Sequence, residues 1–159
     1  MMTVDDIKPG CGEEVIEKEG KVAPRTQSRR VALQALYQWQ VTNEEVPEII
    51  KQFQEAQLLE GLDFDLFKTL ISEISVKAED LDALYETYLD RSVARIDPVE
   101  KAIMRMGVYE LQNSIAIPYK VVINECVELA KRFGADESHK YVNGILDKAA
   151  KQLRATEIS

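Results

Sequence analysis

Apolar residues recur along this chain at spacings of three and four, and no segment alternates with period two over a useful length. In the first such segment these spacings relate Val31, Ala32, Ala35, Leu36 and Trp39, which would share one face of a helix. Further segments with the same period follow, bounded by proline, glycine or aspartate. The sequence therefore predicts an all-α fold, a single-domain bundle of about seven helices with short connections.

Residues that favour helix starts and stops give the expected boundaries. We predict helices over 27–42, from Pro47 to near Gly61, from Asp63, from about Glu79 through Leu89, from Asp97 to about Asn113, from Pro118 to Gly134, and from Ser138 onward. Asp97 is expected to cap its helix, because its carboxylate can accept the first amide hydrogens. Pro118 is expected in a first turn, and Ser138 as the cap of the last helix.

Residues 1–24 mix charged residues, glycine and proline with isolated aliphatics and show no sustained period. We predict a flexible acidic N-terminal tail there, followed by a folded domain over 25–155. Cys11 and Cys126 are too few, and too different in surroundings, for a disulfide framework. No stretch approaches 18 consecutive apolar residues and the N-terminus is acidic, so we expect a cytoplasmic protein without a membrane span.

Charge is distributed unevenly along the 159 residues, whose net charge is −8. An acidic protein repels phosphate at long range, which taken alone argues against nucleic-acid binding. Residues 25–41, however, contain three arginines and no acid, whereas residues 42–91 contain thirteen acids and four bases. The average therefore hides a local basic helix that could bind a polyanion.

Enzyme chemistry has little support in the sequence. His139 is the one histidine, and there is no metal-ligand spacing, glycine-rich phosphate loop or nucleophile motif. Paired carboxylates such as Glu44 and Glu45 are interpreted as solvated helix starts. We expect no catalytic residue, no metal and no cofactor.

The first helix carries the candidate contacts. Arg25 and Arg29 lie four residues apart, as do Arg30 and Gln34, so each pair shares a helix face. The guanidinium groups could bind successive phosphates, and Gln34 could offer a donor and an acceptor to a base. The alternative is a solvated face. Because Arg29 and Arg30 precede the strongest part of the apolar stripe, replacing both by alanine should leave folding nearly unchanged.

Four blocks of sequence, at 31–40, 99–105, 118–125 and 129–147, closely resemble the NusB family of bacterial transcription antitermination factors. The last block reads Leu-Ala-Lys-Arg-Phe-Gly-Ala-Asp-Glu-Ser-His-Lys-Tyr-Val-Asn-Gly-Ile-Leu-Asp. The resemblance implies an all-α protein that binds the boxA element of nascent single-stranded RNA together with NusE, a ribosomal small-subunit protein. Such a pair joins an antitermination complex on RNA polymerase and suppresses termination, chiefly in ribosomal RNA operons.

The same resemblance implies roles for particular residues. Arg25, Arg29 and Arg30 match the arginine-rich first helix that engages RNA. Further RNA contacts are implied at Gln34, Lys120, Lys140 and Tyr141. Tyr37 and Glu100 match positions of the NusE surface, although Tyr37 and Trp39 fit a core stripe as well as a base-stacking platform.

One other class of function stays open from the residues: a helical adaptor that binds only protein, with the acidic segment 42–91 facing a basic partner. An enzymatic class, suggested by the similar helical domains that precede the catalytic region of certain RNA cytosine methyltransferases, is not expected. Nothing beyond residue 153 could form a cofactor-binding α/β domain, so this chain would have to be a fragment. Some members of the NusB family form dimers, and no residue here decides whether this chain does.

Overall fold

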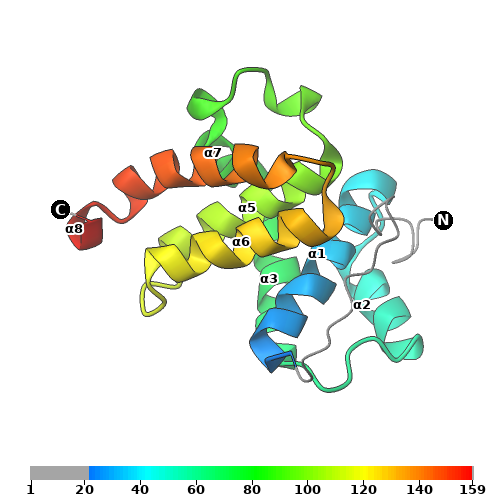
Figure 1. The fold of residues 1–159 in the computed structure, drawn as a ribbon. Helices are drawn as coiled ribbons and strands as arrows, with labels where there is room; N and C mark the ends of the chain where they lie inside the picture. Colours follow the sequence, from blue (N-terminus) through cyan, green and yellow to red (C-terminus); the bar gives the residue numbers. More distant parts are fainter. Residues whose placement is uncertain (1–21, 159) are drawn as a thin grey trace. The chain divides into compact units, whose positions relative to one another are not determined.

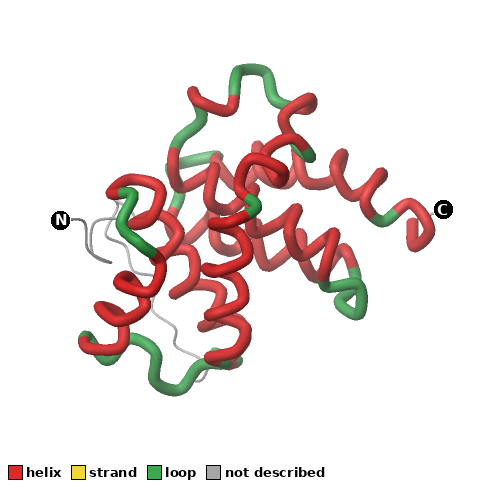
Figure 2. The backbone as a smooth tube through the Cα atoms, turned by 180° about the vertical axis from the view of Figure 1, so that it is seen from behind, coloured by secondary structure: helices red, strands yellow, loops and turns green. Residues whose placement is uncertain are grey.

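A computed structural model describes residues 22–158, and all regular structure in that part is helical (Figures 1 and 2). The all-α prediction is thereby confirmed for the described residues. Residues 1–21, most of the predicted tail, lie outside them. By contact density the chain divides into two compact units, at Val76 and Lys77, which we call unit 1 and unit 2.

Unit 1 contains three helices that pack pairwise: α1 (Pro24–Thr42), α2 (Val46–Glu55) and α3 (Phe64–Val76). Four residues of the predicted stripe of α1 are buried, namely Val31, Ala32, Ala35 and Leu36, and so is Leu33. Trp39, the fifth, is partly exposed. The ring of Phe67 on α3 lies 6.3 Å from that of Phe53 on α2. The second helix ends at Glu55, well before Gly61, so the predicted stop at that glycine is wrong.

A polar network holds the connection between α1 and α2. The carboxylate of Glu44 accepts hydrogen bonds from the amides of Gln38 (2.8 Å) and Gln52 (3.0 Å) and from the hydroxyl of Thr42 (3.0 Å). These bonds, Gln52's first, hold the pKa of Glu44 below its usual value. Glu44 is therefore a partner of neighbouring side chains rather than only a solvated helix start.

Unit 2 is built on three longer helices, α5 (Pro98–Asn113), α6 (Tyr119–Phe133) and α7 (Ser138–Leu153), which pack against one another in pairs. Short elements complete it: α4 (Ala78–Ala83), the 3₁₀ turns η2 (Glu86–Tyr88) and η3 (Val93–Arg95), and α8 (Ala155–Ile158). No helix within 22–158 is long and apolar enough to cross a membrane.

The fourth helix ends at Ala83 instead of continuing through Leu89, so that prediction is wrong in extent. Asp82 accepts two hydrogen bonds of 2.8 Å each from the Arg105 guanidinium on α5, and a third of 2.8 Å from the Tyr85 hydroxyl. Burial, and then Asp82, raise the pKa of Tyr85. These long-range contacts outweigh the local helical pattern, and segment 84–97 becomes an irregular arch that contacts α7 through η2 (Figure 1).

Of the two predicted helix caps, one is confirmed and one is wrong. Asp97 accepts from the amides of Val99 (2.7 Å) and Glu100 (3.3 Å), as predicted. Ser138 does not cap α7; it is the first helical residue, and Glu137, in a left-handed conformation (φ 69°), precedes the helix. The Ser138 hydroxyl instead donates to Glu100 on α5 over 2.6 Å. Ser138 therefore connects α7 to α5 and does not cap α7.

The C-terminal segment is fastened by Arg154, which is buried beside the end of α5. Its guanidinium donates to the carbonyl oxygens of Leu111 (2.6 Å) and Ser114 (2.9 Å) at the C-terminal end of that helix. Glu157 on α8 pairs with Arg154 at 2.6 Å and accepts from the amide of Tyr119 at 3.0 Å. The start of α6 therefore lies beside α8 and the end of α7.

Candidate nucleic-acid interface

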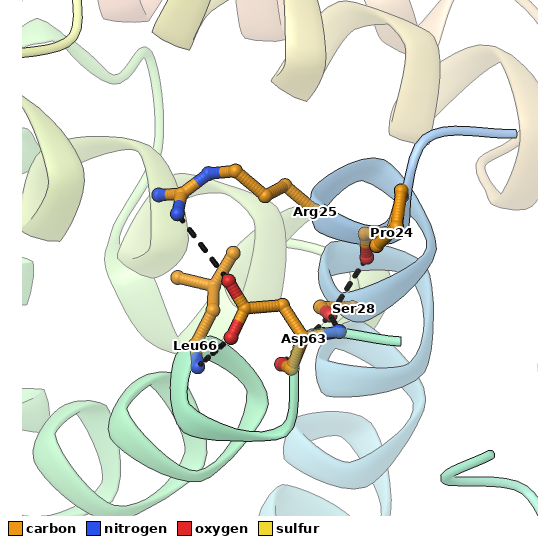
Figure 3. A network of polar contacts seen from close by, with 5 residues as sticks. All are labelled: Pro24, Arg25, Ser28, Asp63 and Leu66. Carbon is orange, nitrogen blue, oxygen red and sulfur yellow. Dashed lines mark hydrogen bonds and ion pairs between the residues drawn. The ribbon is translucent and has the colours of Figure 1, made fainter. Parts of the chain in front are cut away.

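The N-terminal part of α1 is bonded to Asp63, the residue that precedes α3. Ser28 accepts from the Asp63 amide at 2.7 Å, and its hydroxyl lies 2.8 Å from the carbonyl of Pro24 (Figure 3). The Asp63 carboxylate accepts from the Leu66 amide, which caps α3, and lies 3.4 Å from Nη1 of Arg25 (Figure 3). Arg25 is thus oriented by a carboxylate while half of its side chain, 52%, stays exposed.

The three arginines of α1 have different surroundings. Arg25 is exposed and Arg30 is partly exposed, but Arg29 keeps only 4% of its surface accessible. The expectation that Arg29 could be removed without harm to folding conflicts with this burial. The sequence spacing could have predicted the burial of Arg29, because Arg29, Leu33 and Leu36 follow one another at i, i+4 and i+7 on the buried face.

A half-exposed track on α1 collects three of the predicted residues. Arg30, Gln34 and Tyr37 lie at i, i+4 and i+7, and each is partly exposed. The next residue on this track is Val41, which is exposed to 46%. Two candidate RNA contacts and one candidate NusE contact therefore share a single helix face.

The start of α7 brings Lys140 and Tyr141 together with a loop. Lys140 is 71% exposed and its Nζ lies 2.7 Å from Glu137, which raises the pKa of the lysine and keeps it charged. The Tyr141 hydroxyl donates to Asp90 at 3.2 Å, and the Arg91 guanidinium lies 5.1 Å from the centre of the ring. Partial burial, and then Asp90, raise the pKa of Tyr141.

Sequence reasoning missed Asp90 and Arg91. Asp90 also accepts from Arg91 at 2.7 Å and 3.1 Å, so the loop presents a paired carboxylate and guanidinium beside the aromatic ring. The helical period of the sequence predicted a helix through Leu89 and gave no indication that Asp90 and Arg91 would lie next to α7. The contact is visible only in three dimensions.

Lys120 lies away from that cluster. It is exposed in the first turn of α6, whereas Lys140 is in the first turn of α7, and the two helices are consecutive and antiparallel (Figure 1). A helix of 15 residues is about 22 Å long, so the two lysines lie at opposite ends of the pair. Unit 2 does not present them as one compact patch.

Glu100 lies in the first turn of α5, where a carboxylate is favoured by the helix dipole. Its bond from Ser138 connects it to the start of α7, two residues before Lys140. Glu100 is only partly exposed, so it can position α7 as well as face a partner. Among residues 22–158, no group of three or more histidine, cysteine, aspartate or glutamate side chains has an arrangement that could hold a metal ion.

Known proteins match this chain over residues of both units. The model of the NusB family matches residues 26–151. The transcription antitermination protein NusB of Hydrogenovibrio crunogenus is 64% identical over 156 residues, which are 98% of this chain and 97% of that protein. This match extends into the N-terminal segment that the structure does not describe.

Solved structures agree with the sequence matches. T. maritima NusB superimposes with a TM-score of 0.70 at 31% identity, covering 82% of this chain and 94% of that one. A crystal structure of the antitermination factors NusB and NusE in complex with double-stranded RNA superimposes with a TM-score of 0.72 at 27% identity, covering 80% and 96%. The chain belongs to the NusB family.

Proposed function

We propose that this chain is a non-catalytic transcription antitermination factor that acts in the cytoplasm. It binds the boxA element of nascent RNA together with NusE, joins the complex on RNA polymerase and suppresses termination in ribosomal RNA operons. The observation that carries the proposal is the family match over 26–151, together with the structural likeness to a NusB that was crystallised with NusE and RNA.

RNA contacts are assigned to exposed cations and to side chains beside them. On unit 1, Arg25 and Arg30 bind phosphates, and Gln34, one turn beyond Arg30, faces a base. Arg29 is buried, so we assign no phosphate contact to it. A guanidinium suits phosphate because its donors form a fixed fork.

On unit 2, Tyr141 offers a ring face for stacking and Lys140 a charge for phosphate. Lys120 contributes a separate phosphate contact at the other end of α6. Because single-stranded RNA is read chiefly through stacked bases and backbone charge, aromatic and cationic residues in adjacent positions support this assignment.

NusE contacts are assigned to Tyr37 and Glu100. Tyr37 is half-exposed and lies one turn from the exposed Val41, which gives an apolar strip on α1 for a protein partner. Glu100 offers a carboxylate to a basic partner.

A titration of a labelled boxA oligomer, with and without NusE and at several salt concentrations, tests the proposal. We expect binding that is tighter with NusE and weaker as salt rises, with a log-log slope of about −0.7 per phosphate neutralised. Binding of NusE without any RNA binding would favour the protein adaptor instead, which the acidic segment 42–91 supports. A salt-independent affinity would exclude the electrostatic part of the proposal.

A further inference from the structure

Two glycines inside helices of unit 2 differ in what surrounds them. At Gly107 on α5, an added Cβ would lie 2.8 and 2.9 Å from the two terminal carbons of Leu146 and 3.2 Å from Sγ of Cys126. The close packing of α5 against its neighbours therefore requires a glycine there. At Gly144 on α7, an added Cβ would meet nothing within 4 Å.

Neither packing nor backbone conformation explains Gly144. The residue is exposed in the interior of the 16-residue helix α7, and Gly61 is the one glycine with positive φ among the described residues. Glycine destabilises a helix interior relative to alanine, because it loses more backbone freedom on folding. Alanine would fit the folded chain better at this position.

The surroundings of Gly144 indicate what could need the space. Lys140 lies four residues before it and Lys148 four residues after it, so the three share one track along α7, and both lysines are exposed. Tyr141, with the Arg91 guanidinium against its ring, lies three residues before it. Asp147 is on the neighbouring track. Gly144 is thus a position without a side chain, between two cations and beside an aromatic ring.

We propose that Gly144 is a point of close approach for the backbone of single-stranded RNA, which runs along α7 between Lys140 and Lys148. The missing side chain lets a sugar-phosphate unit contact the helix surface, while the two lysines bind the phosphates on either side and Tyr141 stacks a base. The inference rests on the proposed RNA-binding function and adds Gly144 and Lys148 to its site. A single side chain at position 144 would hold the RNA away from both lysines.

The test compares the full chain with Gly144→Ala and Gly144→Gln in binding a labelled boxA oligomer and in thermal melting. Both variants should melt about 2–4 °C higher than the parent, because helix propensity rises. Both should nevertheless bind RNA at least about tenfold more weakly, with glutamine worse than alanine. Gln152→Ala, an uncharged change at an exposed site two turns further along α7, is the matched control and should bind as the parent does.

Lys148→Ala supplies a second measurement that does not depend on helix stability. It should weaken RNA binding and reduce the steepness of the salt dependence by about 0.7, as loss of one phosphate contact requires. If the parent binds RNA and Gly144→Ala binds it within twofold, the inference is overturned while the proposed function stands. If Gly144→Ala loses NusE but keeps RNA, the surface belongs to the protein partner and the RNA assignment is equally overturned. Failure of the parent itself to bind RNA would count against the proposed function.

Discussion

Different kinds of polar interaction stabilise the irregular connections of the two units. In unit 2, Asp82 and Arg105 form a charged pair whose side chains are only 13% and 10% exposed, at the base of the arch 84–97. In unit 1, Glu44 is the only charged member of a network with Gln38, Gln52 and Thr42, in which Gln38 is buried and the other three are partly exposed. A buried charge that loses its partner is costly, whereas a partly exposed carboxylate is still solvated and a lost hydrogen bond between neutral groups costs less. Substitution of Asp82 in unit 2 should therefore cost far more stability than substitution of Glu44 in unit 1.

The largest effect is expected at Asp82. Asp82→Ala leaves the Arg105 guanidinium buried without its carboxylate and the Tyr85 hydroxyl without its acceptor. We expect the free energy of unfolding, measured by urea denaturation, to fall by about 3–5 kcal/mol. RNA binding should weaken as well, because the arch carries Asp90 and Arg91 against Tyr141.

The double variant Asp82→Ala/Arg105→Met is the control for that loss. Removing both charges leaves an apolar side chain in this buried place and should recover most of the stability, since the penalty comes from a buried charge that has lost its ion pair with Asp82. A loss below about 1 kcal/mol for Asp82→Ala alone would mean that water reaches Arg105, and the contrast between the units would disappear.

A second test separates the neighbouring arginines of unit 1. Arg29→Ala removes a buried side chain and should cost about 2–3 kcal/mol of stability. Arg30→Ala changes a partly exposed residue and should alter stability by no more than about 0.5 kcal/mol. If Arg30 binds a phosphate through charge-assisted hydrogen bonds worth about 1.5–3 kcal/mol, its replacement should still weaken RNA binding by tenfold or more.

Melting curves and RNA titrations on the same two proteins measure both quantities. Equal melting temperatures for Arg29→Ala and the parent would show that the burial of Arg29 contributes nothing to folding. An RNA affinity of Arg30→Ala within twofold of the parent would assign that arginine to solvation of the helix face alone.

Much of the fold was predictable because it follows from local patterns. The period of α1, the cap at Asp97 and the stop at Gly134 depend on neighbouring residues and agree with the structure. The end of α4 and the bond from Ser138 depend on residues far away in the chain, which periodicity cannot report. The candidate site divides in the same way: the track of Arg30, Gln34 and Tyr37 is local, whereas the contact of Arg91 with Tyr141 is not.

An intermediate effect is expected between α5 and α7. Ser138→Ala removes the 2.6 Å bond to Glu100 but leaves the carboxylate in place, and should cost about 1–2 kcal/mol. If Glu100 contacts NusE directly, this variant keeps NusE binding while Glu100→Gln weakens it, which a pull-down measures. Loss of NusE with both variants would instead mean that Glu100 acts by holding the start of α7.

The smallest effect is expected at Glu44, and it should depend on pH. Hydrogen bonds from Gln52 and Gln38 hold the pKa of Glu44 below its ordinary value of 4.5 in the folded protein. A carboxyl with a lowered folded pKa stabilises the fold fully above its unfolded pKa and loses that contribution as pH falls through the folded value. Glu44→Gln should therefore be less stable than the parent at pH 7, by about 0.5–1 kcal/mol.

That difference should shrink as the pH falls below 4.5 and vanish once Glu44 is protonated. Other carboxylates titrate in the same range, but they do so in both proteins, so the difference between the two unfolding curves isolates Glu44. Urea denaturation of parent and variant at pH 7, 5, 4 and 3 measures it. A difference that stays constant over this range would assign the effect to packing of the side chain rather than to its charge, and a difference above about 3 kcal/mol would place the Glu44 network in the same class as the buried pair of unit 2.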